Sequence, residues 1–146
     1  MERPELPNEF RFEVRLRTRW VDEDAQQVLN NAVYLTLMEE ARHAYFSRLD
    51  LLDGNRFPFV LGQVNASFLA PGRGGTDVLV RAATVSLGRT SFEQAYRIVE
   101  AASGVVWCEA VARLVAWDAG RRAKAPLGRE FRAALVEFEG LCDPAD

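Results

Sequence analysis

Three consecutive acids, Asp22, Glu23 and Asp24, precede an expected helix start by a few residues, and their types and spacing could do chemistry. A carboxylate of ordinary pKa, about 3.9 for aspartate, is ionised at neutral pH and needs no histidine to activate it. It can attack a carbonyl carbon directly, or it can orient a water molecule that attacks instead. The sequence leaves both routes open, and a solvated acidic loop is the alternative without chemistry.

The helix expected after the acids could supply the second half of that chemistry. Asn30 and Asn31 are typical of a helix N-cap. A helix N-terminus carries about half a positive charge and several unpaired amides, which suit negative charge developing on a carbonyl oxygen. The six residues between Asp24 and Asn31 permit the loop to fold back. The amide near Asn31 is therefore a candidate partner for the Asp24 carboxylate.

The elements that must position these groups follow from periodicity. Residues 11–20 alternate apolar and charged side chains, which predicts a strand with one buried face. The following helix repeats apolar side chains at three- and four-residue steps and is expected to end at Gly54. Turn sequences then separate four strand-length runs, and a last helical pattern closes the chain; these segments are 59–70, 76–87, 91–100, 105–117 and 127–140.

This order of elements predicts a single α+β domain over residues 1–146, in which an antiparallel sheet of about five strands packs on one long helix. Successive strands are expected to be antiparallel neighbours. A single helix leaves sheet edges and part of a face uncovered, which indicates a homo-oligomer, with dimer and tetramer both open.

Composition narrows the classes of partner. The net charge of -3 comes from interspersed acids and bases, which argues against nucleic acid. No apolar run approaches the roughly 18 residues that span a bilayer, and the start MERPELPNEF is unlike a signal peptide. We therefore expect no membrane partner and a cytoplasmic protein. Two cysteines and one histidine, His43, offer neither a disulfide framework nor a set of metal ligands, and Cys108 is expected to pack in the core.

Taken together, these residues resemble a known family. The motif consists of Trp20, Asp22, Asp24, Asn30, Asn31, Tyr34, Glu39, Ala41 and Arg42, joined by the sequence GRTSF at 88–92. It resembles the hot-dog-fold acyl-CoA thioesterases of the 4-hydroxybenzoyl-CoA thioesterase type, and the resemblance runs through nearly the whole chain. It implies a hot-dog fold, in which the sheet wraps around the central helix, and hydrolysis of an acyl-CoA thioester to free acid and coenzyme A.

The resemblance also implies roles for particular residues. It makes Asp24 the carboxylate that acts on the thioester and the amide near Asn31 the group that polarises its carbonyl, and it places Tyr34 in substrate binding. Coenzyme A, which enters as part of the substrate and not as a cofactor, is implied to lie along a subunit interface. Its phosphates would then lie near Arg89, Thr90 and Ser91.

This chain departs from the family pattern at two positions. Many relatives carry glycine and histidine where it carries Gln27 and Val28. A glycine could supply backbone freedom or a close approach to substrate that glutamine cannot. A non-catalytic hot-dog module that binds acyl thioesters, or only forms oligomers, is therefore the alternative. A dehydratase of this fold ranks last, because it generally uses a histidine near its acid.

Overall fold

The computed structural model describes residues 3–144. Its elements in chain order are β1 (Phe12–Arg17), a 3-10 turn (Trp20–Asp22), α1 (Asn31–Arg48), β2 (Phe59–Phe68), β3 (Asp77–Leu87), β4 (Ser91–Glu100), β5 (Val106–Asp118), β6 (Ala123–Lys124) and α2 (Arg129–Glu139). This is the predicted order of one strand, one long helix, four strands and one short helix. Strand β6 was not predicted, because two residues are too few to show alternation.

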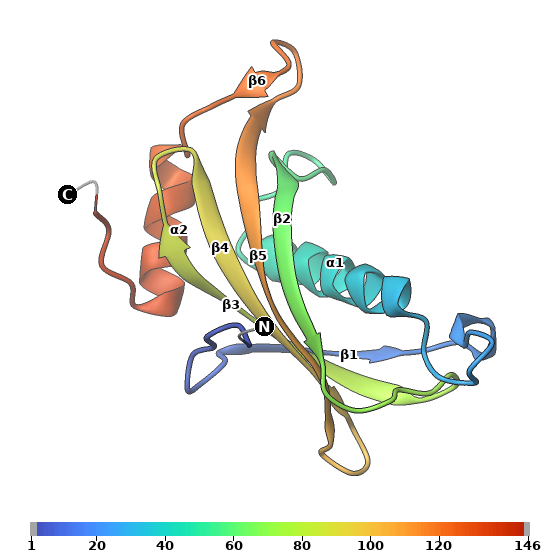
Figure 1. Ribbon diagram of the computed structural model, residues 1–146. Helices are drawn as coiled ribbons and strands as arrows, with labels where there is room; N and C mark the ends of the chain where they lie inside the picture. The colour runs from blue at the N-terminus through green and yellow to red at the C-terminus, as the bar shows by residue number, and fades with distance from the viewer. Residues whose placement is uncertain (1–2, 145–146) are drawn as a thin grey trace.

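The strands form one antiparallel sheet in the order β1-β3-β4-β5-β2, with β6 paired to the end of β5. Strands β3, β4 and β5 are sequence neighbours and sheet neighbours, as expected. The expectation is wrong for β2, which pairs with β5 instead of β3. Helix α1 carries the chain from β1 at one edge to β2 at the other, so both become edge strands (Figure 1).

Helix α1 lies across the inner face of the curved sheet (Figure 1). Its buried side chains include Tyr34, Met38, Ala41, Tyr45 and Phe46, and they share one core cluster with side chains from every main strand. Small residues on the inner face of the central strands leave room for large helix side chains; these are Ala82, Ala110 and Ala112. The core therefore fixes the position of α1, including its N-terminus, relative to the sheet. No described helix is long and apolar enough to cross a membrane.

The two ends of α1 differ from each other in how well they were predicted. At the start, the Asn30 side chain accepts a hydrogen bond from the Ala32 amide at 3.0 Å, as the N-cap prediction requires. The end expected at Gly54 is wrong, because α1 stops at Arg48. Asp50 takes a left-handed conformation (φ 56°), and the Leu51 amide donates to the Phe46 carbonyl, which closes the helix. The apolar spacing continued past this end because Leu49 and Leu52 pack on the core from the loop.

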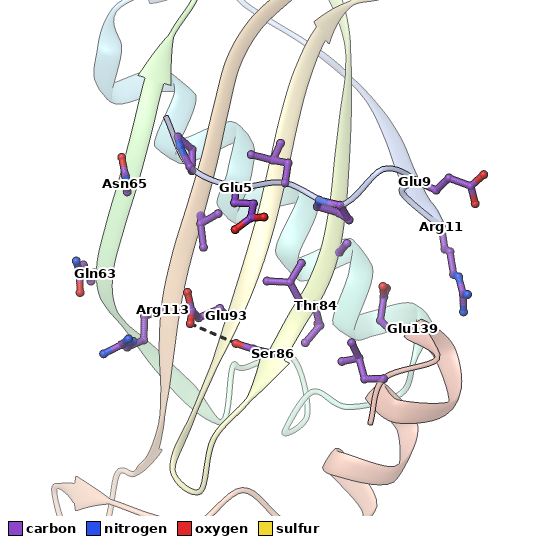
Figure 2. A pocket seen from close by; sticks show the side chains of 17 residues that line it. Glu5, Glu9, Arg11, Gln63, Asn65, Thr84, Ser86, Glu93, Arg113 and Glu139 are labelled. Carbon is purple, nitrogen blue, oxygen red and sulfur yellow. Dashed lines mark hydrogen bonds between the residues drawn. The ribbon is translucent and has the colours of Figure 1, made fainter. Parts of the chain in front are cut away.

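The outer face of the sheet is crossed by the N-terminal segment before β1 (Figure 2). Arg3 pairs with Glu109 on β5, which also pairs with Arg97 of β4 at 2.8 Å. The Arg97 guanidinium lies 5.2 Å from the Phe10 ring centre. These contacts hold the segment on the side of the sheet opposite α1.

Candidate active site

Residues 22–30, here called the acid loop, form a narrow hairpin that leads into α1. The Asn30 amide donates to the Asp22 carbonyl at 2.8 Å, and the Asp24 amide donates to the Val28 carbonyl at 2.9 Å. A bridge between Glu23 and Leu29 lies between these bonds. The loop therefore folds back as the spacing permitted, and three residue steps of about 3.3 Å put Asp24 and the start of α1 roughly 10 Å apart.

Asp22 has a structural role in this hairpin. Its buried carboxylate accepts hydrogen bonds from the Arg19 amide at 2.8 Å and from the Arg19 guanidinium at 2.8 and 3.1 Å. Burial alone would raise the pKa of Asp22, but the hydrogen bonds and charge of Arg19 lower it below its ordinary value. Asp22 thus accepts a backbone amide and helps to fix the loop. Arg17, two residues before Arg19, pairs with Asp77 at 2.9 Å instead of with the acid loop.

Glu23 ties the acid loop to the connection between β2 and β3. Its carboxylate accepts a hydrogen bond from the Gly74 amide at 2.9 Å. A side chain at Gly74 would come within 2.5 Å of the Arg19 carbonyl oxygen, so this close approach requires glycine. The Leu29 amide donates to the Gly72 carbonyl at 2.9 Å and forms a second tie.

Asp24 differs from its two neighbours because its side chain is exposed and has no ion pair within residues 3–144. One carboxylate oxygen accepts the Gln26 amide at 2.7 Å, and the Asp24 carbonyl accepts the Gln27 amide at 2.9 Å. These bonds fix the turn and leave the second oxygen open. Of the three acids, Asp24 is therefore the one whose carboxylate can meet a ligand.

The backbone at Gln27 has a conformation that would suit a glycine. Gln27 has a φ of 60°, the left-handed conformation that glycine adopts freely and other residues adopt at a cost of about 1–2 kcal/mol. The acid loop thus keeps the backbone turn that a glycine would favour. Gln27 strains this turn without preventing it.

The start of α1 presents an open hydrogen-bond donor. The Ala32 amide donates to the Asn30 side chain, and the Val33 amide donates to the Asn30 carbonyl at 2.9 Å. The Asn31 amide has no acceptor in the described chain, and Asn31 is exposed. No acid lies in the first turn of α1 to neutralise this positive end. The acid loop thus joins a carboxylate that has one open oxygen to an amide that has no acceptor in the described chain.

The buried side chain of Tyr34, in the first turn of α1, supports this arrangement. Its side chain is 2% exposed, and its hydroxyl accepts a hydrogen bond from the Gly72 amide at 3.2 Å. Its ring packs on Phe68 with centres 5.1 Å apart, and burial raises its pKa. Tyr34 therefore positions the β2–β3 connection, and its contact with substrate stays a prediction.

Within one copy of the chain, Arg89, Thr90 and Ser91 lie far from Asp24. They form the β3–β4 turn, at the end of the sheet opposite the acid loop (Figure 1). The sheet register places Ser91 beside Val115, while the acid-loop end lies near Trp107, eight residues away on β5. At about 3.3 Å per residue, the Val115 and Trp107 positions are roughly 26 Å apart along β5. One copy alone does not bring the predicted phosphate site to the carboxylate.

A cleft elsewhere on the molecule contains none of the residues assigned to catalysis or to coenzyme A binding. It has a volume of about 720 Å³ on the outer face of the sheet, between the N-terminal segment and the end of α2 (Figure 2). Its side chains carry both signs of charge, and Glu93 there accepts from Ser86 at 3.2 Å. This Ser86–Glu93 pair lies on the sheet face opposite α1, away from the amides of its N-terminus (Figure 2). The size of this cleft alone therefore does not identify the active site, and the acid loop remains the better candidate on chemical grounds.

Sequence reasoning missed a buried chain of polar side chains between α1 and this cleft. Arg42 donates to the Tyr96 hydroxyl at 2.7 Å, and that hydroxyl donates to Gln94. At the other end, the Tyr45 hydroxyl contacts Thr84 at 2.9 Å and donates to Glu139 at 3.0 Å. Burial raises the pKa of Tyr96 to about 12. The signal in the sequence was the inward register of Gln94 and Thr84 on otherwise apolar strand faces.

Other candidates for chemistry are weak. Residues 3–144 contain no group of three or more His, Cys, Asp or Glu side chains able to hold a metal ion. Cys108 is buried as predicted, and burial raises the pKa of its thiol to about 12, so it is not a ready nucleophile. His43 packs edge-on against Phe57 and lies 3.3 Å from the Asn55 carbonyl oxygen, away from the acid loop.

Comparisons with known proteins agree with this architecture. The profile of the thioesterase superfamily matches residues 26–107, which is more than half of the chain. A thioesterase from Thermus thermophilus, solved in complex with coenzyme A and Zn, is 32% identical; the match covers 93% of this chain and 100% of that chain, with a TM-score of 0.80. No curated protein matches the chain.

Two further solved structures share the fold at lower identity. A thioesterase-superfamily protein from Jannaschia sp. CCS1 is 24% identical, covers 94% of this chain and 88% of its own, and has a TM-score of 0.83. A 1,4-dihydroxy-2-naphthoyl-CoA thioesterase from Synechocystis is 22% identical, with coverage of 86% and 96% and a TM-score of 0.77. The predicted hot-dog fold is confirmed, and the chain belongs to the thioesterase superfamily.

Proposed function

We propose that this chain is an acyl-CoA thioesterase in which Asp24 acts on the thioester and the Asn31 amide stabilises the carbonyl oxygen. The observation that supports the proposal is that the three acids of the acid loop are hydrogen-bonded differently. Asp22 and Glu23 are engaged by Arg19 and Gly74, while Asp24 keeps an open oxygen in the same hairpin that presents the free Asn31 amide. Coenzyme A in the Thermus thermophilus relative supports the choice of thioester.

Two routes fit this geometry. In the first, the Asp24 carboxylate forms a bond to the carbonyl carbon, the carbonyl oxygen becomes negative at the Asn31 amide, and the C–S bond breaks. Coenzyme A leaves as a thiolate and takes a proton from water, and a second water hydrolyses the anhydride to the free acid. In the second, Asp24 removes a proton from a water molecule that attacks the same carbon, the C–S bond breaks, and the proton passes from Asp24 to the departing coenzyme A thiolate. The amide donor contributes about a hundred- to a thousand-fold in rate on either route.

The exposed position of Asp24 supports a site that is completed by a second copy of the chain. The accessible surface is 8805 Å², whereas a compact monomer of 16.4 kDa exposes about 7,500 Å². The excess, about 1,300 Å², exceeds the roughly 800 Å² that each partner buries in a standard interface. Edge strand β2 and the residue that follows it carry exposed apolar side chains, which are Val60, Leu61, Phe68 and Leu69.

A two-fold dimer through β2 would also assemble the predicted substrate site. Two β2 strands paired antiparallel place the Phe59 end of one copy beside the Phe68 end of the other. The β3–β4 turn lies at the Phe59 end, and the acid loop lies at the Phe68 end. Arg89, Thr90 and Ser91 of one copy would then approach Asp24 of the partner, where they could contact the phosphates of coenzyme A. A tetramer built from two such dimers keeps the same site.

The proposal is tested by turnover and binding measured on the same preparation. Aryl- and fatty-acyl-CoA substrates are offered to the wild type and to Asp24→Asn, which keeps the shape of the side chain and removes its charge. We expect hydrolysis of at least one substrate class by the wild type and a loss of about a thousand-fold or more in the variant. Saturable binding of a nonhydrolysable acyl-CoA without turnover of any substrate would favour the binding module instead.

A further inference from the structure

Arg42 is a buried cation without an acid partner in the described chain. It is 6% exposed, and its Nε atom donates a hydrogen bond to the Tyr96 hydroxyl at 2.7 Å. Glu39 and Glu40 precede it on α1, yet neither forms an ion pair with it within residues 3–144. A buried charge is normally paired, because otherwise nothing compensates for its lost hydration. The partner of Arg42 is therefore expected outside the single chain.

The two terminal nitrogens of Arg42 are open to a ligand. A guanidinium group has five N–H donors, and the described residues use only the one on Nε. No fully buried side-chain nitrogen or oxygen of residues 3–144 lacks a hydrogen-bond partner, so both terminal nitrogens reach accessible surface. Together they form a fork that matches the two oxygens of a carboxylate.

Contacts with the sheet fix the position of the Arg42 head group. Its guanidinium carbon lies 5.4 Å from the Tyr96 ring centre, and the Tyr96 hydroxyl donates to Gln94. Tyr96 and Gln94 are fully buried on the face of β4 that packs against α1. The head group therefore lies between α1 and the sheet, and not on the solvent side of the helix.

The side of α1 that carries Arg42 faces strand β2. The side chains at four-residue steps along this side are Tyr34, Met38, Arg42 and Phe46. The Tyr34 ring centre lies 5.1 Å from that of Phe68, and the Phe46 ring centre lies 4.9 Å from that of Phe59. Phe59 and Phe68 are the two ends of β2. Arg42 therefore lies between the two places where α1 and β2 touch through aromatic rings.

Between these ring contacts the sheet presents small side chains to α1. The register places Ala66 of β2 beside Ala110 of β5, and Ala110 beside Tyr96 of β4. Ala66 is half-buried, whereas Ala110 is fully buried. On the other side of Tyr96, Ala82 of β3 is fully buried too. The slot between α1 and β2 is therefore closed toward β3 and opens at the β2 edge.

The slot leads from the acid loop to the guanidinium. Arg42 follows Asn31, the first residue of α1, by a distance of roughly 16 Å along the helix axis. Helical side chains lean toward the N-terminus, which brings the head group of Arg42 to about 10–16 Å from the Asn31 amide. An extended chain of about eight to twelve carbon atoms spans this distance. Apolar walls suit its methylene groups, and the fork at the end suits a carboxylate.

We propose that Arg42 binds a carboxylate at the far end of the acyl group, so that the protein prefers ω-carboxyacyl-CoA thioesters to plain fatty acyl-CoA thioesters of the same length. This inference rests on the proposed function, since the thioester carbonyl is assigned to the Asn31 amide. It adds to that function the class of acyl group, which has a medium-length apolar chain and a terminal negative charge. Arg42 is then the residue that determines specificity.

The test compares kcat/KM for decanoyl-CoA and for its ω-carboxyl counterpart within each preparation. Wild type should favour the carboxylated substrate, and Arg42→Met, which keeps an unbranched apolar side chain and removes the charge, should lower that preference by about ten- to a hundred-fold. Arg42→Lys should lie between them, because it keeps the charge and loses the fork. A ratio of two substrates in one sample does not depend on the fraction of folded protein.

Two controls separate recognition of the carboxylate from a general effect of charge. Arg48→Met removes the same charge from the same helix at an exposed position without an ion pair in the described chain, and should leave the preference within about twofold of wild type. A substrate pair of about four carbon atoms cannot reach Arg42, so Arg42→Met should leave the preference for that pair unchanged.

An unchanged preference in Arg42→Met would overturn the inference. Weaker dimerisation of Arg42→Met in sedimentation, with equal losses of activity on both decanoyl substrates, would also overturn it and assign Arg42 to a second copy of the chain. Nonhydrolysable thioether analogues of the two substrates supply a reading without turnover. If wild type hydrolyses neither substrate but binds the carboxylated analogue more tightly through Arg42, the proposed function fails and this inference stands; equal binding of both analogues would overturn the inference as well.

Discussion

Replacement of Gly72 by alanine should destabilise the protein and misplace the acid loop. The added methyl group would lie 2.7 Å from the Tyr34 hydroxyl oxygen, 2.8 Å from a ring carbon of Trp107 and 3.0 Å from the Leu29 Cβ. Each distance is roughly 0.5–1 Å below ordinary contact between heavy atoms. All three neighbours are at most 2% exposed, so none can move into solvent. Overpacking of a rigid core costs about 1–3 kcal/mol, and three simultaneous contacts put Gly72→Ala near about 3 kcal/mol.

The effect on activity follows from the position of Gly72. Its carbonyl accepts the Leu29 amide, so displacement of this residue pulls on the strand that leads to Asn31. A shift of about 1 Å between reacting groups can cost a hundred-fold in rate, and we expect kcat to fall at least tenfold in the folded variant. The free energy of unfolding is measured by urea denaturation, and kcat is measured well below the transition.

Gly75→Ala is the control, because Gly75 belongs to the same connection and has no atom within 4 Å of the added methyl group. Its φ of 62° limits the expected loss to about 1 kcal/mol of backbone strain, with kcat close to that of wild type. If Gly72→Ala unfolds within about 0.5 kcal/mol of wild type, which is the spread of neutral substitutions, the tight contact between this connection and the acid loop is not as described.

Three further predictions concern single residues. Gln27→Val should lose about 1–2 kcal/mol of stability, and Gln27→Gly should lose none, because the φ of 60° suits glycine and opposes a branched side chain; urea denaturation of both checks this. A thiol reagent should modify Cys142 in the native protein and Cys108 only after unfolding, since Cys108 is buried; rapid labelling of both would refute that. Burial raises the pKa of Glu139, despite the Tyr45 hydrogen bond, so its protonated form favours folding. The stability of wild type relative to Glu139→Gln should therefore be higher near pH 4.3, about the ordinary value, and decline as pH rises through the raised pKa; a pH-independent difference would contradict this.

The sequence predicted the elements well because each one carries a strong local pattern. Strand β1 shows clean alternation, and Asn30 supplies the cap that starts α1. The end of α1 was missed because Asp50 takes the left-handed position that is usually given to glycine. The pairing of β2 with β5 was missed because it depends on packing between distant segments, which one-dimensional periodicity does not encode.

The candidate site was predictable in its residues and less so in their surroundings. The acid run and the following asparagines marked the loop, yet the tie between Glu23 and Gly74 joins positions 51 residues apart and has no local signal. The distance between Arg89 and Asp24 within one copy likewise depends on the sheet register, because the register determines how far apart the two residues lie along the strands. Position along the chain therefore indicated the chemistry, and the tertiary fold decided which of three acids is available for it.

The most direct test of the account compares the three neighbouring acids in single-turnover hydrolysis of an acyl-CoA substrate by Asp22→Asn, Glu23→Gln and Asp24→Asn. The account predicts that Asp24→Asn lowers the rate by about a thousand-fold or more and unfolds like wild type. The other two variants should lose stability, because each leaves a donor poorly satisfied, and keep most of the rate while folded. A folded Asp24→Asn protein that turns over substrate as fast as wild type would contradict the assignment of Asp24 as the acting carboxylate.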